Sequence, residues 1–156
     1  MQFKNPFFVS VRMFLVILGG IHSSCLADLI VDMNAGSLAY GNISTWSNEG
    51  LLGGFFTSQG DPVVEDVGDK KAVTFDGNDS FVSTFQVPGE ITGNNSYTVA
   101  VWAYNPSVAN EECMVNWAKR WTTSRCAQLN YGTSTSYGAV THWAGDDMGF
   151  DGGVPA

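Results

Sequence analysis

The fold class follows from one stretch, Lys71–Phe85, which reads KAVTFDGNDSFVSTF. Side chains of different character alternate over residues 71–76 and again over 80–85, and this is the two-residue period of a β-strand. Between these runs lies Gly77-Asn78-Asp79, and glycine, asparagine and aspartate are residues that tight turns favour. The stretch therefore predicts two antiparallel strands that pair as a β-hairpin.

Similar short runs recur along the rest of the chain, with turn residues between them. Residues 96–104 form the clearest single strand and carry bulk on both faces, which predicts a central strand with Trp102 buried. We find no helical periodicity beyond the first 27 residues. Together these features predict an all-β antiparallel sandwich of the jelly-roll type, with no helix of consequence after residue 28. The other runs that predict strands are 29–33, 113–117, 126–131 and 137–143. The side chains expected in the core are Val73, Phe75, Phe81, Val99, Val101, Val115, Leu129, Trp46, Trp102 and Trp117.

Three motifs follow one another along the chain: Leu29–Asp32 with Trp46–Asn48, then Val73–Val82, then Tyr97–Trp102. Their order resembles the laminin-G-like (concanavalin A-like lectin/glucanase) jelly rolls of bacterial secreted proteins. Residues 130–132, 138–140 and 142–143 resemble a subgroup of large planctomycete-type extracellular proteins. The resemblance implies adhesion or glycan contact within a larger extracellular protein. It also implies further strands beyond residue 156, so residues 28–156 are expected to be a partial domain that is incomplete at its C-terminus.

The first 27 residues have the pattern of a secretory signal peptide. Lys4 and Arg12 make the start positive, the uncharged run Met13–Ile21 follows, and small residues stand at Cys25 and Ala27. This order predicts cleavage after Ala27 and a secreted or cell-surface protein. The apolar run is shorter than the roughly 20 residues that a transmembrane helix needs.

A second interpretation of this leader stays open. Cleavage after Ser24 would make Cys25 the first residue, and a lipid on that cysteine would anchor the protein to a membrane. In either case the leader takes Lys4 and Arg12 with it and no acidic residue, so the remaining chain is more negative than the full chain.

Charge excludes two classes of partner. The chain has 7 Lys plus Arg against 15 Asp plus Glu, and its formal net charge is -8. Nucleic-acid binding depends on Lys and Arg that neutralise phosphates. Anionic lipid surfaces attract basic segments for the same reason. We therefore expect neither nucleic acid nor a membrane surface as a partner.

Two aspartates in the predicted turn, Asp76 and Asp79, are the candidate metal ligands. Calcium takes 6–8 oxygen ligands, among them carboxylates and backbone carbonyls, and the resemblance implies calcium at the rim of such domains. The alternative is that Asp76 only caps its turn with an Asx-type hydrogen bond. Both interpretations stay open in the sequence.

The candidate ligand-binding residues are Trp121, Trp143 and Asp146. Trp121 lies in an expected turn, where a tryptophan ring is able to stack on a sugar. Trp143 ends an expected strand beside Asp146-Asp147, whose carboxylates are able to accept a cation or sugar hydroxyls. The alternatives are packing for the two tryptophans and a solvated loop for the aspartates. The expected partners are carbohydrate or an extracellular protein.

Catalytic patterns do not emerge from the sequence. His142 is the one histidine after the leader, which is too few for a typical zinc site. There is no G-x-S-x-G motif and no E-x-D-x-x-E run of the glucanase kind. Glu111 and Glu112 are adjacent, so on a strand they face opposite sides and do not act as a pair. We therefore predict a binding module and not an enzyme, with a structural spacer and a glycoside hydrolase as alternatives.

Cys113 and Cys126 lie on two strands that are expected to pair with Cys113 opposite Asn130. In that register the two cysteines are about 13 Å apart along the ladder. A disulfide needs Cα atoms within about 7 Å, so buried thiols are expected. A longer loop or a shifted register would restore the disulfide.

Overall fold

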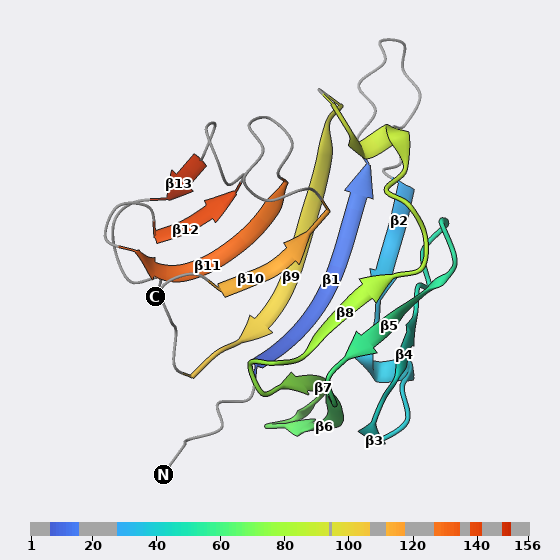
Figure 1. Ribbon diagram of the computed structural model, residues 1–156, viewed down its shortest axis with the longest axis vertical. Coiled ribbons are helices and arrows are strands. Elements are labelled where there is room, and N and C mark those ends of the chain that lie inside the picture. Colours follow the sequence, from blue (N-terminus) through green and yellow to red (C-terminus); the bar gives the residue numbers. More distant parts are fainter. Residues whose placement is uncertain are drawn as a thin grey trace. The chain divides into compact units, whose positions relative to one another are not determined.

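A computed structural model describes residues 7–15, 28–93, 95–106, 112–117, 127–134, 138–141 and 148–150. The chain divides into two compact units, Met1–Asn105 and Pro106–Ala156 (Figure 1). The strands of the first unit are β1 (Phe7–Leu15), β2 (Asp28–Met33), β3 (Gly41–Asn42), β4 (Thr45–Ser47), β5 (Phe55–Gln59), β6 (Val63–Val67), β7 (Lys70–Phe75), β8 (Ser80–Ser83) and β9 (Tyr97–Tyr104). Two short 3-10 turns, η1 (Ala35–Ser37) and η2 (Gly89–Ile91), accompany them.

The first unit contains two antiparallel sheets. One has six strands in the order β2-β1-β7-β6-β3, with β9 paired to β1, and the other has three in the order β4-β5-β8. The described residues contain no α-helix. The prediction of an all-β antiparallel sandwich is therefore confirmed, while the jelly-roll topology stays a prediction.

The second unit is a four-stranded antiparallel sheet in the order β10-β11-β12-β13. Its strands are β10 (Glu112–Asn116), β11 (Gln128–Ser134), β12 (Gly138–Thr141) and β13 (Met148–Phe150). In neither unit do the described residues form a helix with the length and apolar character to cross a membrane.

The predicted hairpin over Lys71–Phe85 is wrong in its pairing, although both strands are present. β7 pairs with β6 and β1, whereas β8 pairs with β5 in the other sheet. The turn between β7 and β8 therefore carries the chain from one sheet to the opposite one. Buried side chains explain the difference, because Ala72, Val73 and Thr74 are all buried and need cover on both faces of β7.

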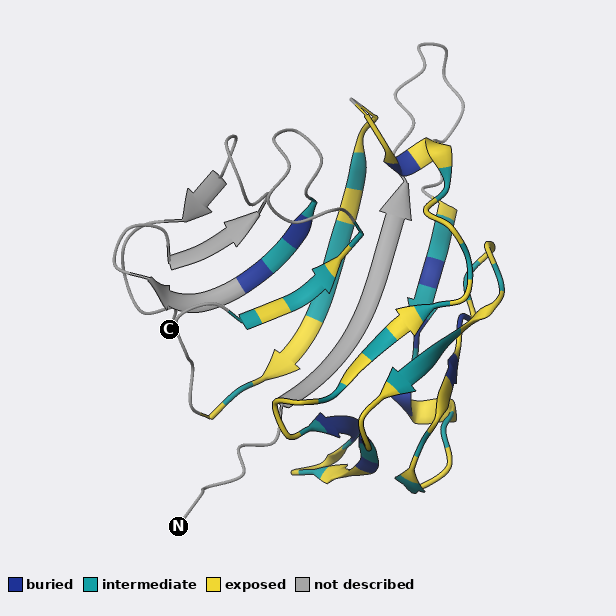
Figure 2. Cartoon of the chain, in the orientation of Figure 1, coloured by how far each residue is buried: buried dark blue, intermediate teal, exposed yellow. Residues whose placement is uncertain are grey.

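Aromatic rings connect the two sheets of the first unit. Phe75 at the end of β7 makes an edge-on contact with Phe81 of β8, with ring centroids 6.0 Å apart. Phe81 in turn contacts Trp46 of β4 edge-on at 5.5 Å, and Trp46 is only 2% exposed. Edge-to-face contacts of this kind add about 0.5–1.5 kcal/mol beyond their burial. Figure 2 marks the buried positions on β7 and β6, three consecutive residues on β7 and one on β6.

The core predictions are confirmed for Trp46 and Val73, both of which are fully buried. The other expected core residues that the structure describes are half-buried, except Trp102, which is exposed. The half-buried ones are Phe75, Phe81, Val99, Val101, Val115, Leu129 and Trp117.

Trp102 is 70% exposed, and the prediction that it is buried on a central strand is wrong. β9 pairs with β1 along one edge and stands outside the main path of the six-stranded sheet. Its C-terminal half is exposed in Figure 2. Bulk on both faces of a strand shows that each face is apolar, but it does not show that another layer covers that face.

A buried amide holds β2 to the loop that precedes β5. Asn48 is 7% exposed, and its Oδ1 accepts hydrogen bonds from the backbone N–H of Asp32, at 2.8 Å, and of Gly50, at 2.9 Å. Its Nδ2 donates to the carbonyls of Ile30, at 3.1 Å, and Gly53, at 2.9 Å. One side chain thus satisfies four backbone groups, as burial of those groups requires.

The same loop approaches β2 closely enough to require a glycine. A Cβ at Gly50 would lie 2.6 Å from the carbonyl carbon of Ile30, which no side chain tolerates. The backbone N–H of Leu51 donates to Leu29 and that of Leu52 donates to Ile30, at 2.9 and 3.1 Å. The loop therefore completes hydrogen bonds along the edge of β2.

Replacing Asn48 tests how much these four hydrogen bonds stabilise the first unit. We expect Asn48→Ala to lower the free energy of unfolding by about 2–4 kcal/mol, because each abandoned buried partner costs about 1–3 kcal/mol. Asn42→Ala is the matched control, because Asn42 is exposed on β3, and it should change the free energy of unfolding by less than about 0.5 kcal/mol. Urea unfolding of the full chain measures both. Equal urea midpoints for the two variants would contradict this role of Asn48.

Candidate functional site

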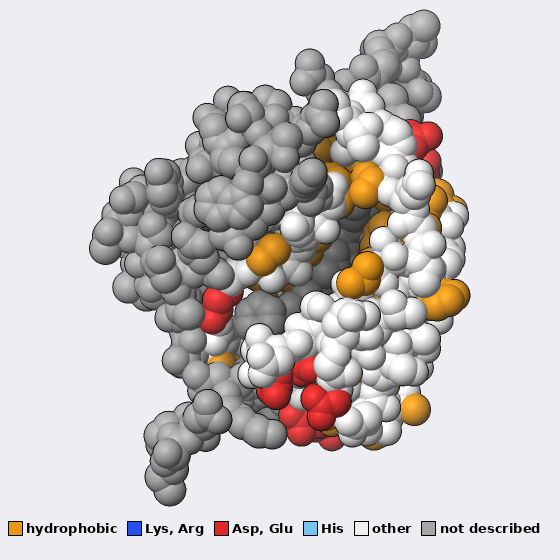
Figure 3. All heavy atoms as spheres, in the orientation of Figure 1, with side chains coloured by type: hydrophobic (Ala, Val, Ile, Leu, Met, Phe, Trp, Pro, Cys, Tyr) orange, Lys and Arg blue, Asp and Glu red, His pale blue; other side chains and the backbone are white. Residues whose placement is uncertain are grey.

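Two crossovers between the sheets lie side by side at one corner of the first unit. Residues Gly60–Pro62 carry the chain from β5 in the three-stranded sheet to β6 in the six-stranded sheet. The turn Asp76–Asp79 carries it back from β7 to β8. Pro62 is fully buried at this corner. Figure 3 shows acidic side chains gathered at the end of the unit where β6 and β7 lie.

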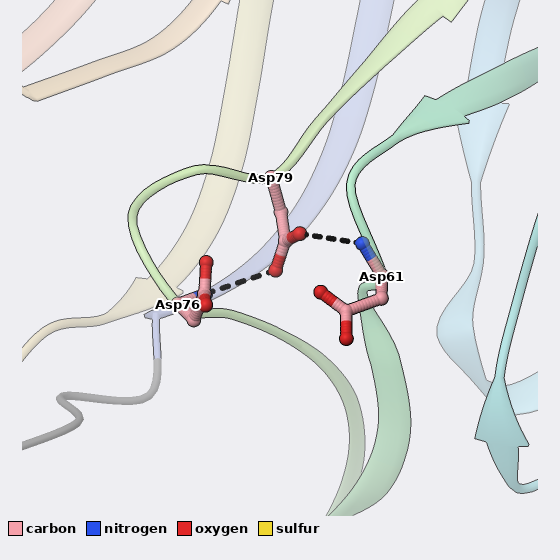
Figure 4. Close-up of side chains that lie close together, drawn as sticks. All are labelled: Asp61, Asp76 and Asp79. Atoms are coloured by element: carbon pink, nitrogen blue, oxygen red, sulfur yellow. Dashed lines mark hydrogen bonds between the residues drawn. The ribbon is translucent and has the colours of Figure 1, made fainter.

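The carboxylate of Asp79 connects the two crossovers (Figure 4). Its Oδ1 accepts the backbone N–H of Asp61 at 2.8 Å, and its Oδ2 accepts the backbone N–H of Asp76 at 3.0 Å. Asp79 thereby satisfies one donor in each crossover. Hydrogen bonds to an ionised acceptor are about twice as strong as neutral ones.

Backbone conformation at the corner depends on glycine. Gly60 has φ +87°, and a Cβ there would lie 2.2 Å from Asp79 Oδ1. Gly77, inside the second crossover, has φ +97°. Positive φ is accessible to glycine at little cost. The sequence therefore places glycine where the carboxylate of Asp79 must approach the neighbouring backbone.

Three carboxylates gather at this corner. Each of Asp61, Asp76 and Asp79 offers an oxygen within 4.8 Å of the others, and Asp61 and Asp76 are exposed while Asp79 is half-buried. Like charges at this separation repel one another, and a bound cation offsets that repulsion. Oxygen donors are also the ligands that calcium prefers. The arrangement is therefore chemically suited to a hard divalent cation.

The Asx-type interpretation of Asp76 is confirmed at the same time. Asp76 Oδ1 accepts the backbone N–H of Asn78 at 2.9 Å. A carboxylate has about four lone-pair sites, so a capping bond leaves further acceptor capacity for a cation. The two interpretations of the turn are thus compatible.

Asp61 is the third carboxylate of this corner, and the sequence did not predict it as a metal ligand. It stands beside Pro62 after β5, 15 positions or more before the predicted pair, so spacing along the chain gives no reason to group it with Asp76 and Asp79. Pairing of the strands brings it there, because both crossovers run between the same two sheets. The Asp61-Pro62 turn signal was the available hint.

A second polar cluster ties the loop after η1 to β6 and β7. The hydroxyl of Tyr40 donates to Asp66 at 2.9 Å, and this bond raises the pKa of Tyr40 above its ordinary value. The ammonium of Lys71 lies 4.4 Å from the centre of the Tyr40 ring and donates to the carbonyl of Leu38. These contacts anchor the loop to β6 and β7.

The predicted ligand-binding residues Trp121, Trp143 and Asp146 lie outside the described residues. The same is true of His142 and Cys126. Of the predicted site residues, Asp76 and Asp79 are the two that the structure describes, and it brings them into one cluster.

The register of β10 with β11 is confirmed at one end and shifted at the other. Cys113 is opposite Asn130, as predicted. An irregularity between Cys113 and Val115 then shifts the pairing, so that the Trp117 N–H donates to Ala127. Cys113 is exposed, so the expectation of a buried thiol is wrong for this residue. Its Sγ lies 3.6 Å from the carbonyl of Val115.

Two aromatic side chains on β9, Trp102 and Tyr104, form an exposed pair, although the sequence pattern predicts that Trp102 is buried. Trp102 and Tyr104 are 70% and 52% exposed. They are two residues apart, so they lie on one face of the strand and about 7 Å apart along it. Exposed large aromatic side chains that cluster mark interaction sites more often than isolated ones do.

Comparison of this chain with protein families, with curated proteins and with solved structures gives no match. The laminin-G-like resemblance accordingly stays a prediction that depends on the motifs alone.

Removing the Asp79 carboxylate tests how the corner is held. We expect Asp79→Ala to lower the free energy of unfolding by about 1–3 kcal/mol, because a charge-assisted bond is lost in each crossover. Asp61→Ala keeps the backbone N–H that Asp79 accepts, so it changes stability by less than about 0.5 kcal/mol without metal. Urea unfolding in a chelator measures both. A larger loss for Asp61→Ala would contradict this role of Asp79.

Proposed function

We propose that this chain is a secreted, laminin-G-like binding module that contacts a carbohydrate or an extracellular protein partner. The observation that carries the proposal is the exposed pair Trp102 and Tyr104 on one face of β9. An indole and a phenol ring on one strand face present a flat apolar surface with polar edges. Such a surface suits the apolar face and the hydroxyls of a sugar ring.

The secreted location is part of the same proposal. The leader pattern in residues 1–27 supports it, and the expected cleavage point after Ala27 falls where β2 begins at Asp28. Cleavage there removes no residue of β2. The acidic charge of the chain favours solubility and disfavours nucleic acid as a partner.

Calcium at the corner of Asp61, Asp76 and Asp79 completes the proposal. In this role the ion offsets most of the repulsion among three carboxylates whose oxygens lie within 4.8 Å of one another, and it cross-links the two crossovers. Extracellular modules bind calcium weakly, at about 10⁻⁴–10⁻³ M, which matches a site of exposed side chains. The ion would act on stability and would leave recognition to the aromatic pair.

The binding role is tested with glycan and extracellular-protein arrays on the full chain. We expect Trp102→Ala to weaken binding of the best ligand at least tenfold. An aromatic side chain that a bound ligand buries contributes about 1.4 kcal/mol or more to the binding free energy. Leu51→Ala is the matched control, because Leu51 is 74% exposed and lies far along the chain from β9. Surface plasmon resonance measures both affinities. Absence of any ligand would favour the spacer alternative, and turnover of a glycan would favour the hydrolase.

The calcium role is tested separately by thermal unfolding and calorimetric titration. At free calcium ten times its Kd, we expect about 1.4 kcal/mol of added stability. Asp61→Asn should abolish this gain, while Glu65→Gln, an exposed position on β6, should retain it with the same change in charge. A gain that survives Asp61→Asn would place the ion elsewhere.

A further inference from the structure

The strand β1 occupies an interior place in the six-stranded sheet. Along one edge Phe8–Leu15 pairs with Tyr97–Tyr104 of β9, residue for residue. Along the other edge Val11–Leu15 pairs with β2, and Phe7 and Phe8 pair with β7. All three partners run antiparallel to β1, and Figure 1 shows it between β9 and β2.

The same residues belong to the leader whose removal is part of the proposed function. Cleavage after Ala27 takes away all of β1 and leaves β2 whole, because β2 starts at Asp28. We call the place of β1 between β9 and β2 the strand slot. Loss of β1 leaves the backbone groups of β9 and β2 that face the slot without the partner they have here.

We propose that the processed chain is a strand acceptor, whose slot takes an extended apolar strand supplied by another protein chain. This inference rests on the proposed secretion and processing, and it specifies the protein partner. Unpaired N–H and C=O groups at a sheet edge are a template for strand addition. Main-chain hydrogen bonds supply the affinity in such complexes. The slot has two facing edges, so one strand satisfies donors and acceptors on both sides.

The sequence of β1 indicates the chemistry of the occupant. It reads FFVSVRMFL, an apolar strand with one basic residue. That residue, Arg12, is in register with Asp32 of β2 and with Ala100 of β9. Opposite charges across a strand pair are favourable, and the chain as a whole is acidic. The occupant is therefore an apolar strand of about eight residues with Lys or Arg opposite Asp32.

The experiment begins with the full chain, into which a specific protease site is inserted between Ala27 and Asp28. The cut protein is carried through a urea unfolding and refolding cycle with excess fluorescent peptide of sequence Phe7–Leu15, so that slow release of the leader is no obstacle. We expect one peptide to bind per chain, as measured by fluorescence anisotropy and size exclusion.

Two variant peptides make the test specific. Val11→Pro places a proline at a position paired with both Met33 and Val101, and a proline donates no ladder hydrogen bond. We expect it to weaken binding at least a hundredfold. Arg12→Glu brings a like charge opposite Asp32, and we expect at least a tenfold loss. Equal binding of all three peptides would overturn the slot, as would a dimer of the cut chain that admits no peptide.

The processing is checked independently, by mass spectrometry of the exported protein. An N-terminus at Asp28 together with refusal of the peptide would overturn the slot and leave the proposed secretion intact. An N-terminus at Met1 would overturn the processing and the open slot with it, whatever the peptide does. Peptide binding with an N-terminus at Asp28 supports both.

Discussion

The first unit depends on the carboxylate of Asp79, which accepts one backbone N–H from each of two neighbouring crossovers between its sheets, β5 to β6 and β7 to β8. A sandwich requires the chain to change sheets, and every change leaves backbone donors outside the ladders. Here two changes lie side by side, between β5 and β6 and between β7 and β8, and one ionised side chain serves both. Gly60 makes the approach possible because no Cβ obstructs the carboxylate.

Asn48 solves the same problem elsewhere in the unit. It satisfies two backbone groups of β2 and two of the loop between β4 and β5, from a side chain that is almost fully buried. The two devices differ in their chemistry. An amide donates and accepts, so it joins carbonyls and N–H groups alike, whereas a carboxylate only accepts and adds a charge that a cation is able to use.

Three features of the first unit support the proposals, each in a different way. The acidic corner gathers three carboxylates as the proposed cation ligands. The exposed aromatic pair on β9 is the proposed ligand surface. The proposed strand slot depends on the backbone edges of β9 and β2, which both pair with β1, and on the charge of Asp32 for its choice of occupant. Since β9 carries the aromatic pair and borders the slot, a strand that fills the slot also steadies the strand that presents those rings.

Sequence alone determined the positions of several strands and the turn chemistry, because a two-residue period and turn residues are local properties. It located β7, β8 and β9, the Asx bond of Asp76 and the register of Cys113 with Asn130. Only the tertiary structure decided which strands pair. It placed β7 and β8 in different sheets, brought Asp61 to Asp76 and Asp79, and left Trp102 exposed. These outcomes depend on which layer covers each face, and alternation along one strand carries no information about its neighbours in space.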